Sequence, residues 1–197
     1  MRKLTVDDIV DLRAYERERA ELRRHIIDLK RMRRVALGPI LTVLFENTET
    51  MRWQVQEMAR AERMLRDEQI SHEVDTYNDL IPEAGELSGT LFLELTSDEQ
   101  LRDWLPRLVG IEFHIAFELP DGSLVYGKPS DEDEERLTRD DTTAAVHYLR
   151  FAFSPEQVAA FETGPVQVIV DHPEYSHRAP LDRVQHASLA ADLVDLT

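Results

Sequence analysis

The sequence predicts an α+β protein in which long N-terminal helices precede a mostly antiparallel sheet with interspersed helices. Residues 1–80 carry apolar side chains mainly at helical spacing, whereas several short segments after Gly89 alternate between apolar and polar residues. Strands and helices do not alternate regularly, as they would in a parallel βαβ sheet. We therefore expect a single domain over 1–197, with a largely helical part in 1–80 that includes one short strand and a sheet-containing part in 89–197.

The first expected helix opens at a capping-box pattern formed by Thr5 and Asp8 and runs to about Arg34. Gly38-Pro39 ends it, because proline lacks a backbone N–H and disfavours helical backbone in the preceding residue. The apolar stripe of this helix consists of Leu12, Tyr15, Leu22, Ile26 and Leu29.

A buried strand is expected next, because Ile40–Glu46 is apolar, short and rich in β-branched residues. Asn47 or Thr48 then caps a second helix. Its apolar face would hold Met51, Val55, Met58 and Leu65. A third and shorter helix is expected over about 68–80.

The second part of the chain predicts strands joined by turns and short helices. The expected strands are Thr90–Leu95, Ile111–Leu119, Ser123–Tyr126, Val146–Phe153 and Val166–Val170. Ser97 and Ser154 cap two of the helices, and residues 181–195 form a closing helix. Pro120-Asp121-Gly122 is the turn of a hairpin.

Composition excludes several classes of protein. The chain contains no cysteine, so disulfides, thiolate nucleophiles and cysteine-ligated metal clusters are ruled out. No stretch reaches the roughly 18 consecutive apolar residues of a membrane helix. Acidic residues at Asp7, Asp8 and Asp11 interrupt the apolar run that a secretory signal requires. We expect a soluble cytoplasmic protein with no membrane partner.

The net charge of −16 is unevenly distributed. Residues 1–66 hold 15 Lys and Arg against 11 Asp and Glu, whereas residues 67–197 hold 8 against 28. The arginine-dense segment 16–34 is interspersed with acids, which favours an amphipathic helix with ion pairs four residues apart. A nucleic-acid partner is not expected, because the acidic remainder would repel it. The same acidic remainder would attract a basic protein.

The motifs of common nucleotide-binding, hydrolase, metalloprotease and calcium-binding sites are missing. Histidines and carboxylates are the metal ligands that remain. The densest group begins with Asp171-His172 and includes Tyr175, just after an apolar strand, and His147 lies in the preceding strand. Consecutive strands are often neighbours. We therefore expect His147 and His172 to lie side by side, with Asp171 or Tyr175 orienting a ring. The alternative is that His147 is a hydrogen-bonded core residue.

A second possible metal cluster lies on the expected helices and comprises Glu57, Glu62, Glu68 and His72. Ferritin-like two-metal sites use a Glu-x-x-His spacing, whereas Glu68 and His72 are four residues apart. The spacing therefore does not favour a two-metal site of this kind.

Four long segments resemble the bacterial family catalogued as domain of unknown function 3501. They read RRVALGPILTVLFENTETMRWQVQEMARAER, DTYNDLIPEAGELSGTLFLEL, AVHYLRF and VDHPEY, in that order along nearly the whole chain. The resemblance implies no assigned activity. It implies a redox or oxidative-stress setting, with rubrerythrin-like or iron–sulfur redox proteins as possible partners.

The family-like segments contain three further candidate residues, Glu46, Glu57 and Asn78. Each also has a structural interpretation. Glu46 and Glu57 could pair with arginines of the first helix, and Asn78 could be a turn residue. Tyr175 could likewise be an aromatic residue at the edge of the core.

Two hypotheses follow from these patterns and from the resemblance, which alone implies the redox setting. The first is a non-catalytic partner or accessory protein of a redox system. The alternative is a metal-binding protein or metal-dependent enzyme with His, Asp and Glu ligands, for which His147 and His172 are the candidate ligands.

A proteolysis experiment tests the one charged run, KPSDEDEERLTRDDTT at residues 128–143. Because this run has no apolar face to bury, we predict a solvated loop that a protease cuts first. Mass spectrometry of the first fragments locates the cut. Protection of the run in hydrogen exchange would contradict the prediction.

Overall fold

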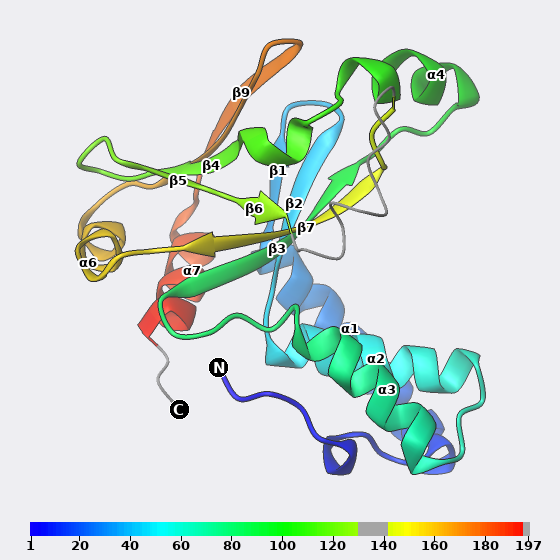
Figure 1. Ribbon diagram of the computed structural model, residues 1–197. Coiled ribbons are helices and arrows are strands. Elements are labelled where there is room, and N and C mark those ends of the chain that lie inside the picture. Colours follow the sequence, from blue (N-terminus) through cyan, green and yellow to red (C-terminus); the bar gives the residue numbers. More distant parts are fainter. Residues whose placement is uncertain (130–141, 195–197) are drawn as a thin grey trace.

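The computed structural model describes residues 1–129 and 142–194 (Figure 1). Its helices are η1 (Val6–Asp8), α1 (Leu12–Met32), α2 (Thr48–Ala61), α3 (Asp67–Asn78), α4 (Asp98–Arg107), η2 (Ile111–His114), α6 (Pro155–Thr163) and α7 (Arg183–Val194), where η denotes a 3₁₀ helix. Its strands are β1 (Arg34–Leu37), β2 (Leu41–Glu46), β3 (Glu86–Leu93), β4 (Ile115–Glu118), β5 (Leu124–Tyr126), β6 (Lys128–Pro129), β7 (Val146–Ala152), β8 (Gln167–His172) and β9 (Tyr175–Pro180). The predicted α+β class is confirmed.

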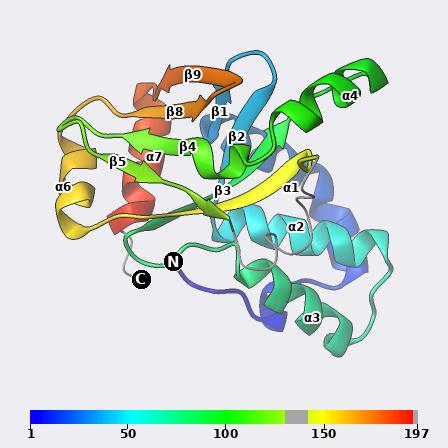
Figure 2. The same ribbon diagram turned by 45° about the horizontal axis from the view of Figure 1, so that its top comes forward.

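The strands form two antiparallel sheets. The first sheet has the order β1-β2-β3-β7-β6, and the second has the order β5-β4-β8-β9. Strand β1 also lies against β9, and β5 lies against β7, so the two sheets meet along both sides. They wrap around one apolar core (Figures 1 and 2).

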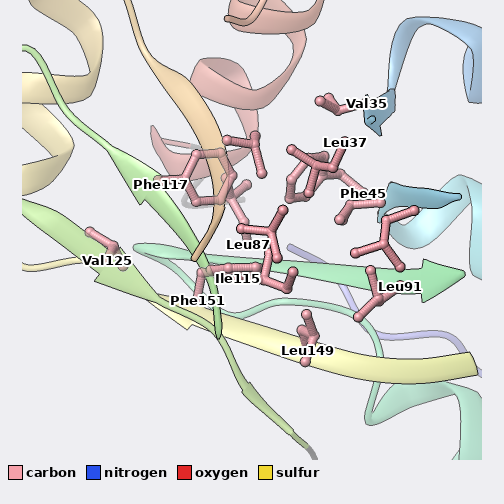
Figure 3. Close-up of a cluster of buried hydrophobic side chains, with 14 of the residues drawn as sticks. Val35, Leu37, Phe45, Leu87, Leu91, Ile115, Phe117, Val125, Leu149 and Phe151 are labelled. Atoms are coloured by element: carbon pink, nitrogen blue, oxygen red, sulfur yellow. The ribbon is translucent and has the colours of Figure 1, made fainter. Parts of the chain in front are cut away.

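The core between the sheets is built on aromatic contacts (Figure 3). The Phe117 ring of β4 lies 5.2 Å from the Phe45 ring of β2 and 5.0 Å from the Phe151 ring of β7. All three side chains are fully buried. Phe161 of α6 and Leu189 of α7 pack against the same cluster, so these helices also contribute to this core.

Gly127 allows the chain to cross from one sheet to the other. Strand β5 pairs with β4 and, one residue later, β6 pairs with β7. A Cβ atom on Gly127 would lie 2.9 Å from the Phe151 ring, so only glycine permits this close approach.

The helices α1, α2 and α3 form a separate layer beside the first sheet (Figure 1). A second apolar cluster joins α2, α3 and the N-terminal segment, and it includes Met51, Val55, Val74 and Ile81. The N-terminal segment is hydrogen-bonded to this layer by the side-chain amide of Gln56, which pairs with one backbone residue as a neighbouring strand would. Gln56 accepts a hydrogen bond from the Val10 N–H at 3.0 Å and donates one to the Val10 carbonyl at 2.9 Å.

The predicted first helix is wrong at both ends. The capping box at Thr5 and Asp8 is present, but it opens only the short η1. Helix α1 begins later, where the Asp11 side chain accepts hydrogen bonds from two backbone N–H groups. It ends at Met32, and strand β1 follows before the Gly38 turn. Pairing of β1 with β2 therefore overrides the helical pattern.

Two more predicted elements are displaced. The expected strand Ile111–Leu119 begins as the 3₁₀ helix η2, so only its second half pairs as β4. Leu65 lies beyond the end of α2 and is 80% exposed, so it is not part of the apolar face. Strand β9 was not predicted, because the polar residues after Tyr175 pair with β8 through their backbone.

Of the charged run 128–143, residues 130–141 lie outside the described residues. Its ends are ordered, which differs from the expected loop. Lys128 and Pro129 form β6, and Thr143 is buried, with its backbone N–H donating to the Leu105 carbonyl at 3.1 Å.

No helix in the described parts of the chain is both long enough and apolar enough to cross a bilayer.

Tyr175 joins the two sheets where β9 meets β1. Its hydroxyl donates to the Leu37 carbonyl at 2.6 Å and accepts from the Ile40 N–H at 3.2 Å. Gly38, inside the same turn, has a φ of +74°, and a Cβ there would lie 2.5 Å from the Tyr175 hydroxyl. Glycine is required both for the backbone conformation and for the space.

We predict that Gly38→Ala destabilises the fold more than Gly122→Ala does. Both glycines have positive φ, which costs roughly 1–2 kcal/mol for alanine. A Cβ at Gly122 meets no atom within 4 Å, whereas one at Gly38 collides with Tyr175 and adds roughly 1–3 kcal/mol. Urea unfolding measures both variants. Equal losses of unfolding free energy would show that the crowding at Gly38 is relieved without cost.

Candidate functional site

The expected shared site of His147 and His172 rests on a wrong strand order. Strand β7, which carries His147, pairs with β3 and β6 in the first sheet. Strand β8, which carries His172, pairs with β4 and β9 in the second sheet. The two strands are consecutive in the described chain but are not hydrogen-bonded neighbours, because the chain changes sheets between them.

His147 is a buried core residue with a defined set of polar contacts. Its Nε2 atom lies 3.0 Å from the Ala144 carbonyl and 3.0 Å from the Thr143 hydroxyl. Because a carbonyl only accepts, Nε2 carries the proton. Its Nδ1 atom lies 4.0 Å from a carboxylate oxygen of Glu112, which is also buried. The interpretation of His147 as a hydrogen-bonded core residue fits this environment.

His172 has both ring nitrogens occupied by the backbone. Its Nε2 lies 3.2 Å from the Val109 carbonyl and so carries the proton, and its Nδ1 accepts from the Glu174 N–H at 3.2 Å. Neither nitrogen has a lone pair left for a metal ion. His172 therefore fixes the β8–β9 turn against the end of α4.

Asp171, the neighbour of His172, is the centre of an exposed hydrogen-bond network. The Tyr126 hydroxyl donates to one of its carboxylate oxygens at 2.7 Å. His114 Nδ1 lies 3.0 Å from the other oxygen. We call Tyr126, Asp171 and His114 the Asp171 network. Its three residues come from β5, from β8 and from η2, so the second sheet assembles the network from distant parts of the sequence.

The strand register explains why these side chains meet. Tyr126 lies opposite Ala116, which lies opposite Ile169 on the same outer face of the second sheet. Because alanine is small, the Tyr126 ring can reach across it to Asp171 on the next strand. Ala116 is fully buried as a result, although it faces away from the core.

The network engages one of the two ring nitrogens of His114. Because a carboxylate oxygen only accepts, His114 Nδ1 is the donor to Asp171, and Nε2 has no hydrogen-bond partner among residues 1–129 and 142–194. The His114 side chain is 37% exposed, and its ring packs edge-on against His172 at 5.0 Å. The hydrogen bond to Asp171 raises the pKa of Tyr126 above its usual value, with burial as a smaller cause.

The surface around the network is apolar as well as polar. Phe113, Leu124 and Tyr126 are 49%, 40% and 42% exposed, respectively. Phe113 precedes His114 in η2, and Leu124 and Tyr126 project to the same face from β5. We call these three residues, which belong to the two segments that carry His114 and Tyr126, the outer-face patch. Exposed aromatic residues beside hydrogen-bonding groups are typical of surfaces that bind other proteins.

A metal site has no support in residues 1–129 and 142–194, where no three His, Asp or Glu side chains are placed to hold an ion. Within the helical cluster, Glu57 accepts from the Tyr15 hydroxyl at 2.6 Å and forms a two-point ion pair with Arg19 at 2.8 Å. This ion pair lowers the pKa of Glu57 and confirms that it pairs with an arginine of the first helix. Glu68 and His72 instead line an open hollow of about 540 Å³ beside η1.

The remaining candidates have structural roles. Asn78 is the last residue of α3, and its side chain accepts from the Leu4 N–H at 2.8 Å and donates to the Leu4 carbonyl at 3.0 Å. The Glu46 carboxylate does not pair with an arginine of the first helix and instead accepts from the Thr90 hydroxyl at 2.8 Å. Tyr175 is buried at the junction of the sheets, and burial raises its pKa.

Three residues of interest were missed: His114, Tyr126 and Glu112. Glu112 and His114 lie in the expected strand Ile111–Leu119, which would place His114 in an ordinary strand position rather than in a 3₁₀ turn. Tyr126 is the last residue of the expected hairpin strand Ser123–Tyr126, and no local pattern links it to Asp171. The available signal was the sequence Glu112-Phe113-His114, in which two ionisable residues flank an aromatic one.

Comparisons with known proteins find matches over nearly the whole chain. The model of the family described as "Protein of unknown function (DUF3501)" matches residues 3–193. A crystal structure described as a novel protein of unknown function from Burkholderia pseudomallei K96243 is similar, with 35% sequence identity and a TM-score of 0.89. The similarity covers 98% of this chain and 100% of that one. No curated protein matches the chain significantly.

We predict that Asp171→Asn lowers the pKa of Tyr126 toward its ordinary value. The carboxylate favours the neutral form of the Tyr126 phenol. This contact therefore stabilises the folded protein below the ordinary tyrosine pKa, and the stabilisation is lost as the pH rises through the raised pKa. Titration of ¹³C-labelled tyrosine by NMR measures the change, and Tyr126→Phe assigns the signal. Asp121→Asn, in the neighbouring hairpin turn, is the control. An unchanged Tyr126 pKa in Asp171→Asn would contradict the hydrogen bond.

Proposed function

Since the chain belongs to the DUF3501 family, whose description assigns no activity, and its Asp171 network lies on an open sheet face, we propose that it is a non-catalytic binding partner of another protein. The observation that carries the proposal is the outer-face patch beside the network. Three large apolar side chains are 40–49% exposed in the two segments that contribute His114 and Tyr126 to the network.

The geometry suits a broad protein surface better than a small substrate. The hollow beside η1 and a second one between α1 and α2 are lined by other residues, so neither encloses the network. An exposed tyrosine that is already oriented by Asp171 loses little rotational freedom on binding. Aromatic residues held in this way often supply most of the binding energy of an interface.

The class of partner follows from charge and from the family resemblance. The net charge of −16 favours association with a basic protein and predicts that the attraction weakens as salt is added. The resemblance implies a rubrerythrin-like or iron–sulfur redox protein. We include this redox setting, and the cytoplasm as the compartment, in the proposal.

Binding to purified candidates tests the proposal. Calorimetry would measure the affinity of this protein for a rubrerythrin-like protein and for an iron–sulfur protein of the same cell, at low and at high salt. We expect binding to one of them that the triple variant Phe113→Ser, Leu124→Ser, Tyr126→Ser weakens roughly tenfold or more, because residues at the centre of an interface cost more than about 1 kcal/mol each.

The matched control removes apolar side chains elsewhere. Val184→Ser and Leu65→Ser change residues that are 52% and 80% exposed but lie on α7 and after α2. These variants should bind as the unmodified protein does. Equal affinity of the triple variant would exclude this face as the interface, and lack of binding to both candidates would refute the redox setting.

A further inference from the structure

A small hollow lies between α1 and α2, on the helical layer rather than on the sheet. Its volume is about 120 Å³, and the residues around it come from the N-terminal segment and from both helices. It shares no residue with the Asp171 network. Its inner wall and its rim differ in chemistry, and this difference indicates a class of ligand.

The inner wall is aromatic and apolar. The Trp53 ring meets the Tyr15 ring edge-on, with their centroids 6.0 Å apart. Leu22 and Ile26 of α1 continue this wall. Tyr15 is fixed by its hydrogen bond to Glu57, and Trp53 remains partly exposed to the hollow. An indole face of this kind attracts organic cations, and the leucine and isoleucine can cover an aliphatic stem.

The rim carries more negative than positive charge. Asp8, Glu18 and Glu49 line it, against a single cationic residue, Arg52. Hydrogen bonds from Arg2 and from the Thr5 N–H hold the pKa of Asp8 well below its usual range, so it is ionised at neutral pH.

Two of these acids already have partners. Asp8 is paired with Arg2 at 2.6 Å, and Glu49 lies 2.5 Å from His25. Glu18 and Arg52 form no ion pair with any residue in the described ranges. Glu18 is therefore the carboxylate most available to a ligand.

We propose that this hollow binds an ammonium or guanidinium group that carries a short aliphatic stem. The charged head would lie beside Glu18 and over the Trp53 face, and the stem would lie along Leu22 and Ile26. A carboxylate ligand would have Arg52 alone as its counter-charge, and the carboxylate of Glu18 on the same rim would repel it. The inference rests on the lining of the hollow and does not depend on the proposed interface of the second sheet.

Fluorescence of Trp53 gives a direct measurement. The chain has two tryptophans, so Trp104→Phe leaves Trp53 as the single reporter. n-Butylammonium should change its emission in a saturable way, with a dissociation constant on the order of millimolar for so small a ligand. n-Butyrate, with a similar stem and the opposite charge, should bind at least about tenfold more weakly, since the rim disfavours it. If Trp104→Phe fails to fold, the indole N–H signal of Trp53 in the unmodified protein gives the same information by NMR.

Two variants test the roles of the charges. Glu18→Gln should weaken n-butylammonium binding about threefold or more, and Arg52→Gln should strengthen it, because each removes one charge from the rim. Butyrate binding as tightly as butylammonium would overturn the proposal, as would an unchanged affinity in Glu18→Gln.

The source of the cation is distinguished by a second probe. Lysine blocked at both backbone ends presents the same ammonium group as a side chain in a polypeptide. Its binding would assign the hollow to a lysine of another protein, and binding of n-butylammonium alone would assign it to a free amine. If neither probe binds, the inference is refuted.

Discussion

The fold depends on one buried cation, the guanidinium of Arg33. This side chain is 1% exposed, and it donates to the Phe45 carbonyl at 2.8 Å and to the Glu46 carbonyl at 3.0 Å. It also donates to the Ser188 hydroxyl at 3.0 Å and forms an ion pair with Asp192. One residue between α1 and β1 thereby fixes strand β2 and the C-terminal helix α7. A buried charge is tolerated only when it is paired and hydrogen-bonded in this way.

The open site on the second sheet depends on a different constraint, the register between its strands. The pairing of β8 with β4 places Asp171 within reach of both His114 and Tyr126. Tyr126 reaches the site across the small side chain of Ala116, and Gly127 lets the chain leave the second sheet immediately afterwards. Long-range pairing thus builds the network, and no local motif marks it.

The sequence predicted the fold class and most strands and helices, because apolar spacing and serine or asparagine caps are local signals. The caps at Asn47, Ser97 and Ser154 are present. Strand order is a long-range property, which is why His147 and His172 were wrongly assigned to neighbouring strands. Strand β9 was not predicted because it also depends on long-range pairing. Its polar residues are stabilised by pairing with β8 rather than by burial of alternate side chains.

The candidate residues also show that a side chain of suitable chemistry is often already used in hydrogen bonds within the fold. Histidines, acids and amides were selected because their chemistry could serve a function, yet a folded chain uses most such groups to satisfy its own buried polar atoms. His172 has both nitrogens engaged by backbone groups, and Asn78 has both ends of its amide engaged by Leu4. His114 differs, because Asp171 occupies only one of its nitrogens and the ring is exposed. A polar atom that the fold orients but leaves accessible is therefore a better guide to function than residue type, and only the three-dimensional pairing of the strands reveals it.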